Sequence, residues 1–485
     1  VKASVSRRKP YRHWLAKNRI ELKGLFGIPG PVIVDRDRVR IIQRVFGYSM
    51  EDLKNILAPM VENAQEPVGS MGNDSSLAVL SEKPQLLYNY FKQGFAQVTN
   101  PPIDPYRENL VMSLMSFVGK ERNLLDETPE HCHQLKLAHP ILTNDDIARL
   151  KQSRIEGYSV STVPMLFDVS RGAGALEVAL SRLCDDVDRK VDEGHSLVIL
   201  SDRGTNETLA PIPALLATSA VHHYLVRVGK RHLSGLVVET GEAREVHHFA
   251  TLVSFGASGI NPYLAFETMA DMQHRGYVSS SYTQEDMLEH YITAIKKGLL
   301  KIMSKMGIST IRSYRGSQIY EAVGLNDDFV DRYFRGTPTR IGGIGIERAE
   351  GDTIARHRRA FAPVGGALKA LDSGGILHVR SQAEKHLFSP EAVTLLQEAT
   401  REGSYETFKR YTATVNDTAK NLCTLRGLFE FKDRTPIPIE EVETVEDILE
   451  RFVTSGMSFG SISKEVHEAI AIAMNSIGLR SNSGE

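Results

Sequence analysis

Cysteine is scarce in this sequence: 485 residues contain 3, Cys132, Cys184 and Cys423, which are far apart and odd in number. A disulfide framework of the kind found in small secreted domains is therefore excluded, and a reducing compartment is expected, with the cytoplasm as the predicted location. Long apolar runs are missing as well, since no stretch approaches the ~18 consecutive apolar residues of a membrane span. We predict no membrane contact.

Net charge is also nearly absent, because 58 Lys and Arg stand against 60 Asp and Glu, giving −2. No global positive field attracts nucleic acid, so no nucleic-acid partner is expected. Hydrophobic residues make up 41% and charged residues 24%, which is typical of a globular protein. At roughly 150 residues per domain, the length predicts two to four domains.

Strand-length apolar runs alternate with helical periodicity between about Lys136 and Ile376. Ser196–Leu200, Ser234–Glu239 and Ala250–Ser254 have the length and bulk of strands buried on both faces. We predict an α/β fold with a central domain built on a mainly parallel sheet flanked by helices. A polar, glycine-containing segment follows each run, at 201–204, 239–243 and 255–263. These segments lie at the carboxyl ends of the predicted strands, and that edge of the sheet is the expected place for a site or a domain contact.

The last stretch, Phe452–Glu485, reads as strand, turn, amphipathic helix and second strand. Ser463 is a suitable helix cap and Gly478 a suitable stop. Helical spacing predicts one buried stripe, made of Val466, Ala469, Ile470, Ala473, Met474 and Ile477. We interpret this as the first βα unit of an incomplete (β/α)8 barrel, and we expect the chain, which begins at Val1, to be a fragment of a larger enzyme.

The two turns of this βα unit should lie side by side at the functional end of the barrel. They supply small side chains, backbone amides and one acid that could lie against a flat ring and its phosphate: Gly456, Met457, Ser458, Ser481, Asn482, Ser483, Gly484 and Glu485. Ordinary βα turns are the competing interpretation.

Other motifs favour structural roles. The glycine pairs in Gly172–Glu177 and Gly343–Arg348 lack the third glycine of a dinucleotide loop. Adjacent histidines on a helix point about 100° apart and cannot share one metal ion, so we expect hydrogen bonding and no metal site at 131–133, 222–223 and 247–248. The cysteines are interpreted as buried and inert rather than as nucleophiles.

Several long blocks resemble the large (α) chain of glutamate synthase, and the resemblance covers essentially all 485 residues. It implies that 1–25 is the tail of a glutamine amidotransferase domain, 26–375 the central domain, and 376–485 the N-terminal part of the FMN-binding (β/α)8 barrel domain. The blocks are SDRGTNETLAPIPALLATSAVHHYLVRVG, SGLVVETGEAREVHHFATLVSFGASGINPYLAFETM, KKGLLKIMSKMGISTIRSYRGSQIYEAVGL, YFRGTPTRIGGIG and FVTSGMSFGSISKEVHEAIAIAMNSIGLRSNSGE.

The resemblance implies an oxidoreductase activity for the parent polypeptide. In that family, ammonia released from glutamine passes through a tunnel to the flavin domain, which makes L-glutamate from 2-oxoglutarate by reduction. FMN and a 3Fe-4S cluster are the implied cofactors, with the cluster ligands outside this chain. The implied partners are the remaining domains of glutamate synthase, and a small chain or ferredoxin as electron donor. None of the three cysteines matches the family's catalytic cysteine, so the chain alone is expected to be inactive.

Site residues follow from the same resemblance. Gly456, Met457 and Ser458 resemble the family's flavin-contacting turn, and Ser481 to Gly484 resemble a stretch beside flavin and 2-oxoglutarate. Glu485 resembles an acid at the point where ammonia reaches the flavin domain, where a carboxylate could accept a proton or steer ammonium. The alternative interpretation is a stand-alone, non-catalytic scaffold or interaction protein derived from the central domain. The choice among NADPH, NADH and ferredoxin stays open.

Overall fold

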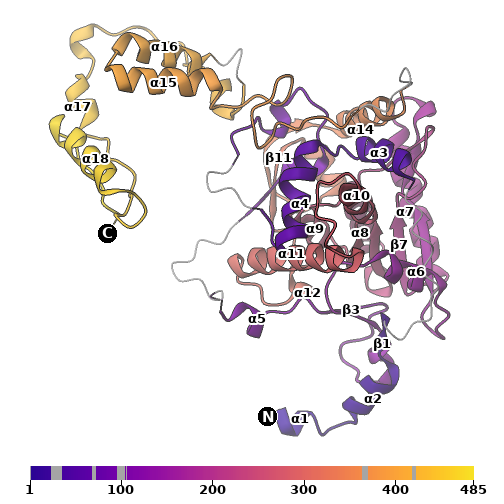
Figure 1. The fold of residues 1–485 in the computed structure, drawn as a ribbon. Coiled ribbons are helices and arrows are strands. Elements are labelled where there is room, and N and C mark those ends of the chain that lie inside the picture. The colour runs from indigo at the N-terminus through magenta and orange to yellow at the C-terminus, as the bar shows by residue number, and fades with distance from the viewer. Residues whose placement is uncertain are drawn as a thin grey trace. The chain divides into compact units, whose positions relative to one another are not determined.

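The computed structural model describes residues 2–22, 35–67, 73–94, 104, 106–362, 370–417 and 422–484 (Figure 1). The strands are β1 (Ile20–Glu21), β2 (Phe91–Gln93), β3 (Ser116–Val118), β4 (Leu135–Leu137), β5 (Val160–Pro164), β6 (Leu166–Asp168), β7 (Leu197–Ser201), β8 (Leu209–Pro211), β9 (Gly235–Glu239), β10 (Gly259–Asn261), β11 (Tyr320–Leu325) and β12 (Thr339–Ile344).

The helices are α1 (Lys2–Val5), α2 (Tyr11–Asn18), α3 (Arg36–Val45), the π-helix η2 (Asp52–Leu57), α4 (Ala58–Asn63), α5 (Glu108–Val111), α6 (Asn144–Gln152), α7 (Ala175–Asp192), α8 (Ala214–Arg227), the 3-10 turn η7 (Arg231–Leu233), α9 (Val246–Ser254), α10 (Tyr263–His274), α11 (Gln284–Lys305), α12 (Ile311–Tyr314), α13 (Asp327–Tyr333), α14 (Ile346–Phe361), α15 (Pro390–Glu402), α16 (Tyr405–Asn416), α17 (Val445–Leu449) and α18 (Lys464–Ser476). None of the described helices is long and apolar enough to cross a membrane.

The chain divides into two compact units, residues 1–428 and 429–485. The first unit contains all of the named strands. The second holds α17, α18 and the two turns of the last βα unit. The domain limits at 25/26 and 375/376, which follow from the family resemblance, stay predictions.

The main sheet of the first unit has the strand order β10-β9-β7-β5, and every pairing in it is parallel. Each strand lies beside the next strand of the series along the chain, with α7, α8 and α9 as the crossovers. Right-handed crossovers that always advance in one direction place these helices on one face of the sheet. The predicted mainly parallel sheet flanked by helices is confirmed.

Both faces of this sheet are buried, and alternate residues of β7 and β9 enter two different cores. Val198, Leu200 and Val238 belong to the larger core, together with residues of α7, α8 and α9. Leu197, Ile199 and Val237 belong to a smaller core. The smaller core is completed by the sheet β1-β4-β3 and by α6. Burial on both faces explains why the strands read as continuous apolar runs.

The prediction of a strand at Ala250–Ser254 is wrong, because these residues form the C-terminal half of α9. The helix is enclosed almost completely, with Val246, Phe249, Ala250, Leu252 and Val253 all at 2% exposure or less. A helix surrounded by protein loses its polar stripe, so a short apolar run cannot be told from a buried strand by periodicity. The strand that follows is β10, inside the stretch 255–263 that was read as a polar turn.

The carboxylate of Glu51, directly before η2, binds the backbone of residues 375 to 378. Glu51, at 7% exposure, accepts hydrogen bonds from four successive backbone amides, those of residues 375 to 378, at 2.8–3.1 Å. The Met50 amide adds a bond of 2.7 Å to the carbonyl oxygen of Asp372. Burial acts to raise the pKa of Glu51, but the four amides outweigh it and the pKa lies below its ordinary value. We call this arrangement the Glu51 clasp.

An ion pair continues the attachment a few residues further on. His386 bonds through Nδ1 to Asp74 at 2.8 Å and through Nε2 to the carbonyl oxygen of Gly375 at 2.9 Å. Burial acts to lower the pKa of His386, yet these two acceptors outweigh burial and raise it. The pKa of Asp74 lies below its usual range, because its bonds to His386 and to the Phe388 amide outweigh burial. Together with the Glu51 clasp, this pair anchors residues 372–388 on the first unit.

Candidate functional site

The carboxyl ends of the main strands carry a buried carboxylate, Asp202, directly after β7. It is completely buried and accepts hydrogen bonds from the Thr240 hydroxyl at 2.6 Å and the Gly241 amide at 3.0 Å. Burial raises the pKa of Asp202 to about 8, although the bond from Thr240 acts to lower it. The loops after β7 and β9 are thereby joined through one carboxyl group.

Glu239, the last residue of β9, is the centre of a second network at this edge. Its carboxylate, 2% exposed, accepts bonds from Lys151 at 2.7 Å, Ser201 at 2.6 Å and Arg203 at 2.9 Å. Arg203 also pairs with Glu267 at 3.1 Å. These mutual pairings satisfy the charges locally, which suits a structural contact better than an open substrate site.

A cavity of about 340 Å³ lies over the same edge, between α3 and the loop after β7. Two arginines, Arg38 and Arg203, and two acids, Asp35 and Glu267, line it. Because the cations and anions balance, the cavity has no clear preference for a ligand of either charge. Its place beneath α3 agrees with the second of the two roles expected for this edge, a contact between parts of the chain.

Arg244, in the loop between β9 and α9, joins this edge of the sheet to the loop after α3. It is 5% exposed, pairs with Asp52 at 2.9 Å and donates to the carbonyl oxygens of Phe46 and Gly47 at 3.1 and 3.0 Å. Sequence reasoning identified the polar edge but missed Asp52 and Lys151. The partners come from segments about 192 and 88 residues away, so no local pattern could reveal them.

The predicted turns of the second unit do lie together. Thr454 accepts a hydrogen bond from the Asn482 amide at 2.8 Å, and residues 453 and 480 form a parallel bridge on either side of α18. A Cβ atom placed on Gly484, whose φ is +77°, would lie 3.1 Å from the Ser458 nitrogen and 3.3 Å from the Met457 nitrogen. We call Gly456–Ser458 with Ser481–Gly484 the paired-turn site. Glu485 lies outside the described residues.

The paired-turn site offers backbone amides in an exposed setting. Among the described residues, neither the Met457 nor the Ser458 amide donates a hydrogen bond. Asn482 instead uses its side-chain oxygen locally, accepting from the Gly484 amide at 2.9 Å. Two neighbouring amides beside a glycine can receive an oxygen atom or the polar edge of a ring. The ligand contacts expected of these residues stay a prediction.

The helix between the two turns begins as expected but is not covered. The Ser463 hydroxyl caps α18 by accepting from the Val466 amide at 3.4 Å, which confirms the predicted start. The predicted burial of its apolar stripe is wrong for the described structure. No residue of α18 is buried, and Val466 and Ile477 are 48% and 55% exposed. Within residues 429–484, no other element covers the stripe.

Histidines and cysteines form no metal centre within the described residues. His247 bonds to the carbonyl oxygen of Tyr88 at 3.0 Å, and His248 to the Glu245 carboxylate at 3.0 Å, which are the hydrogen-bonding roles expected of them. Cys184 and Cys423 are buried and none of the three cysteines is paired. Burial raises the pKa of Cys184 to about 12, so its thiol stays protonated.

The sequence matches the family described as "Glutamate synthase central domain" over residues 42–326, more than half of the chain. The chain belongs to the glutamate synthase family. A second match, to "Conserved region in glutamate synthase", covers residues 386–485 and so includes the paired-turn site.

Relatives within the glutamate synthase family span three printed electron donors. The chain is 42% identical to the glutamate synthase [NADPH] large chain of Bacillus subtilis, 38% to glutamate synthase [NADH] of Schizosaccharomyces pombe and 41% to the chloroplastic ferredoxin-dependent glutamate synthase of Oryza sativa subsp. japonica. Each alignment covers 100% of this chain but only 31%, 24% and 30% of the relative. The chain thus spans less than a third of the length of these relatives.

Solved structures add little to the family assignment. The match to a mutant flavocytochrome b2 covers 60% of this chain and 86% of the flavocytochrome chain, with 10% sequence identity and a TM-score of 0.29. A similarity this low carries no argument about the fold or its ligand.

Proposed function

We propose that this chain is part of a glutamate synthase that forms L-glutamate from glutamine-derived ammonia and 2-oxoglutarate by flavin-mediated reduction. Family membership supports the proposal, and the paired-turn site is the observation that carries it to particular residues. In this proposal, residues 26–375 form the interdomain domain along which ammonia passes, and residues 376–485 begin the FMN-binding barrel. The working enzyme is cytoplasmic and also needs its other domains and an electron donor, either a small chain or ferredoxin.

FMN fits the residues of the paired-turn site. The amides of Met457 and Ser458 have no acceptor among the described residues, and glycine at 484 keeps the space beside them free of a side chain. FMN, when bound, supplies the two electrons that reduce the imine of 2-oxoglutarate. The residues of this chain would hold the ring through Gly456, Met457 and Ser458, while Ser481 to Gly484 would border ring and substrate. Glu485 would accept or steer a proton of the arriving ammonium.

The 3Fe-4S cluster does not fit the cysteines of this chain. Cys132, Cys184 and Cys423 are unpaired and form no cluster with other ligands in the described residues. Burial also keeps the Cys184 thiol protonated, whereas a cluster ligand must be a thiolate. We therefore assign the cluster ligands to other parts of the enzyme.

A pair of glycine substitutions in the intact enzyme tests the flavin assignment. Gly484→Ala and Gly478→Ala share a positive φ, +77° and +73°, and so share the backbone strain of about 1 kcal/mol. Only the Cβ at 484 meets the amides of Met457 and Ser458, while the Cβ at 478 meets nothing within 4 Å. We expect Gly484→Ala to lower both flavin content per polypeptide and the rate of glutamate formation, and Gly478→Ala to keep both near the parent values. Equal flavin content in the two variants would refute the assignment.

A further inference from the structure

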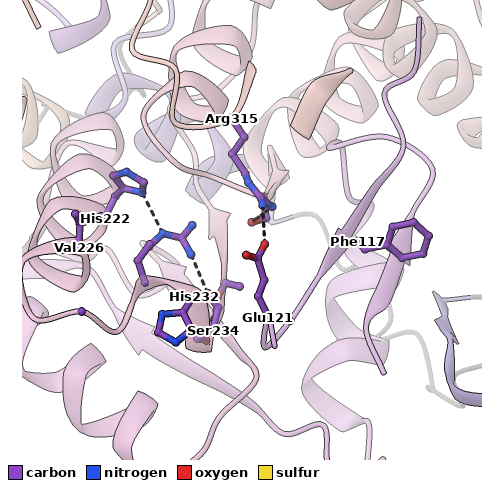
Figure 2. A pocket seen from close by; sticks show the side chains of 12 residues that line it. Phe117, Glu121, His222, Val226, His232, Ser234 and Arg315 are labelled. Carbon is purple, nitrogen blue, oxygen red and sulfur yellow. Dashed lines mark hydrogen bonds and ion pairs between the residues drawn. The ribbon is translucent and has the colours of Figure 1, made fainter. Parts of the chain in front are cut away.

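A second cavity, of about 380 Å³, opens at the edge of the main sheet where the strands begin (Figure 2). Ser234 and Gly235 at the start of β9, and Ser258 just before β10, belong to its wall. The loop after β3 supplies Glu121. This is the edge opposite to Asp202 and Glu239, and it lies in the unit that does not contain the paired-turn site. We call the cavity the basal pocket.

Arg231 brings a positive charge to the basal pocket, and its hydrogen bonds there are to neutral groups. The Arg231 guanidinium donates to His222 Nδ1 at 3.0 Å and to the carbonyl oxygens of Ser234 and Gly256, both at 2.8 Å. Within the part of the chain that the structure describes, no Asp or Glu lies within ion-pair distance of it. Burial lowers the pKa of Arg231 to about 10, which leaves the group charged at neutral pH.

A second arginine faces the same cavity and shares its only acid. Arg315 donates to the Ser258 hydroxyl at 3.1 Å and lies 3.7 Å from a carboxylate oxygen of Glu121. The exposed Arg312 lies 3.2 Å from that same oxygen. One carboxylate is therefore divided between two arginines, and Arg231 adds a third cation. The charges around the basal pocket do not balance, in contrast to those of the cavity beneath α3.

His222 does not supply the missing negative charge, and it also adds no positive one. Burial, followed by the charge of Arg231, lowers the pKa of His222 to about 3, so the ring is neutral at physiological pH. Since Nδ1 accepts from Arg231, the proton of the neutral ring resides on Nε2. Because His222 is neutral, it leaves the positive charge of Arg231 uncompensated, which favours a negatively charged ligand.

Donors remain available for such a ligand. A guanidinium has five N–H groups, and the three bonds of Arg231 leave two of them. Arg315 uses one N–H on Ser258 and only a long contact on Glu121. Guanidinium groups recognise phosphate and carboxylate through charge-assisted hydrogen bonds. The volume of the pocket is in the range of sites for small organic ligands.

We propose that the basal pocket binds a small metabolite through a phosphate or carboxylate group held by Arg231 and Arg315. The site is separate from the paired-turn site, so the proposal does not depend on the proposed function. It gives the central domain a ligand of its own. A bound anion would neutralise the positive charge of the arginines that Glu121 leaves uncompensated.

Calorimetric titration of the chain at low ionic strength tests this, with inorganic phosphate and benzoate as the two probes. Saturable heat with phosphate but not benzoate would assign a phosphate group, and the reverse would assign a carboxylate. Arg315→Met should weaken the bound probe about tenfold or more, because it removes charge-assisted hydrogen bonds. Glu121→Gln should tighten it, because the competing negative charge is lost while the cations remain.

Opposite signs for two neighbouring residues separate binding from general damage to the fold. Arg340→Met is the matched control, since Arg340 is 80% exposed and pairs with Glu321 away from this pocket. It should leave the affinity unchanged. The proposal is overturned if neither probe saturates, if Glu121→Gln fails to tighten binding, or if Arg340→Met weakens binding as much as Arg315→Met does.

Discussion

Replacing Glu51 by glutamine should loosen residues 375–378 without unfolding the rest of the first unit. The substitution keeps the size of the side chain but removes its charge and one acceptor oxygen. At present both oxygens of Glu51 are used, one by the amides of residues 375 to 377 and the other by the His378 amide. The single oxygen of a glutamine is uncharged and has two lone pairs, so we expect it to keep about two of these four bonds.

The size of the effect follows from the number and kind of bonds. A hydrogen bond to a charged group contributes ~1.5–3 kcal/mol and a neutral one ~0.5–1.5 kcal/mol. Four charged bonds replaced by two neutral ones would cost about 3–11 kcal/mol if every amide were buried. Ile376 and Leu377 are 44% and 48% exposed, however, so their amides regain water when released. We therefore expect a loss of about 2–4 kcal/mol in the free energy of local opening.

Native-state hydrogen exchange measures this opening directly. A loss of about 2–4 kcal/mol corresponds to exchange roughly 30- to 900-fold faster at the amides of 376–378, with α11 and β7 unchanged. Glu82→Gln is the matched control, because Glu82 is 80% exposed and bonds only to Lys385 in the same region. Equal protection of 376–378 in the two variants would refute the reasoning.

The clasp also has a defined pH dependence. The pKa values of Glu51 and Asp74 are lowered in the folded state, so their contribution is fully present above the unfolded value of about 4 and is lost as pH falls through the lowered values. The pKa of His386 is raised, so its contribution is fully present below about 6.5 and is lost as pH rises through the raised value. Protection of 372–388, corrected for intrinsic exchange rates, should peak between these limits.

Two further predictions concern packing and charge inside the first unit. Gly298→Ala should lower the free energy of unfolding by about 1–3 kcal/mol, because its Cβ would lie 2.4 Å from Val246. Gly351→Ala, on the open side of α14, should raise the free energy of unfolding by about 0.5–1 kcal/mol. Denaturant titration measures both shifts, and two shifts of the same sign would contradict the reasoning. Arg244→Met should cost about 3–5 kcal/mol because Asp52, 16% exposed, loses its partner, and a change in thermal midpoint no larger than that of an exposed pair would show that the ion pair is not needed.

Long periodic elements of this fold can be predicted closely from the sequence. The runs at 196–200 and 234–239 become β7 and β9, and the helical periodicity expected after them includes the long helix α11, Gln284–Lys305. Strands buried on both faces and helices with one apolar face give strong periodic signals. The failure at α9 has the opposite cause, since a short helix enclosed on every side has no periodicity left to read.

The two candidate regions differ in how far the sequence could predict them. The paired-turn site depends on the order turn, helix, turn within about 30 residues, and one parallel bridge between Val453 and Arg480 brings the turns together without any distant contact. The carboxyl edge depends on Asp52, Lys151 and Glu267, which reach Arg244, Glu239 and Arg203 only after the chain has folded. Polar residues after strands show where such a network forms, but they do not show which partners complete it.

The near absence of burial in the second unit has a calorimetric consequence. Among its described residues, 429–484, Leu479 alone is buried, at 8% exposure. The heat capacity increment of unfolding scales with the apolar surface that becomes newly hydrated. The melting of this chain should therefore show an increment that belongs almost wholly to residues 2–428, well below the ~12–15 cal/mol/K per residue expected if all 485 residues contributed.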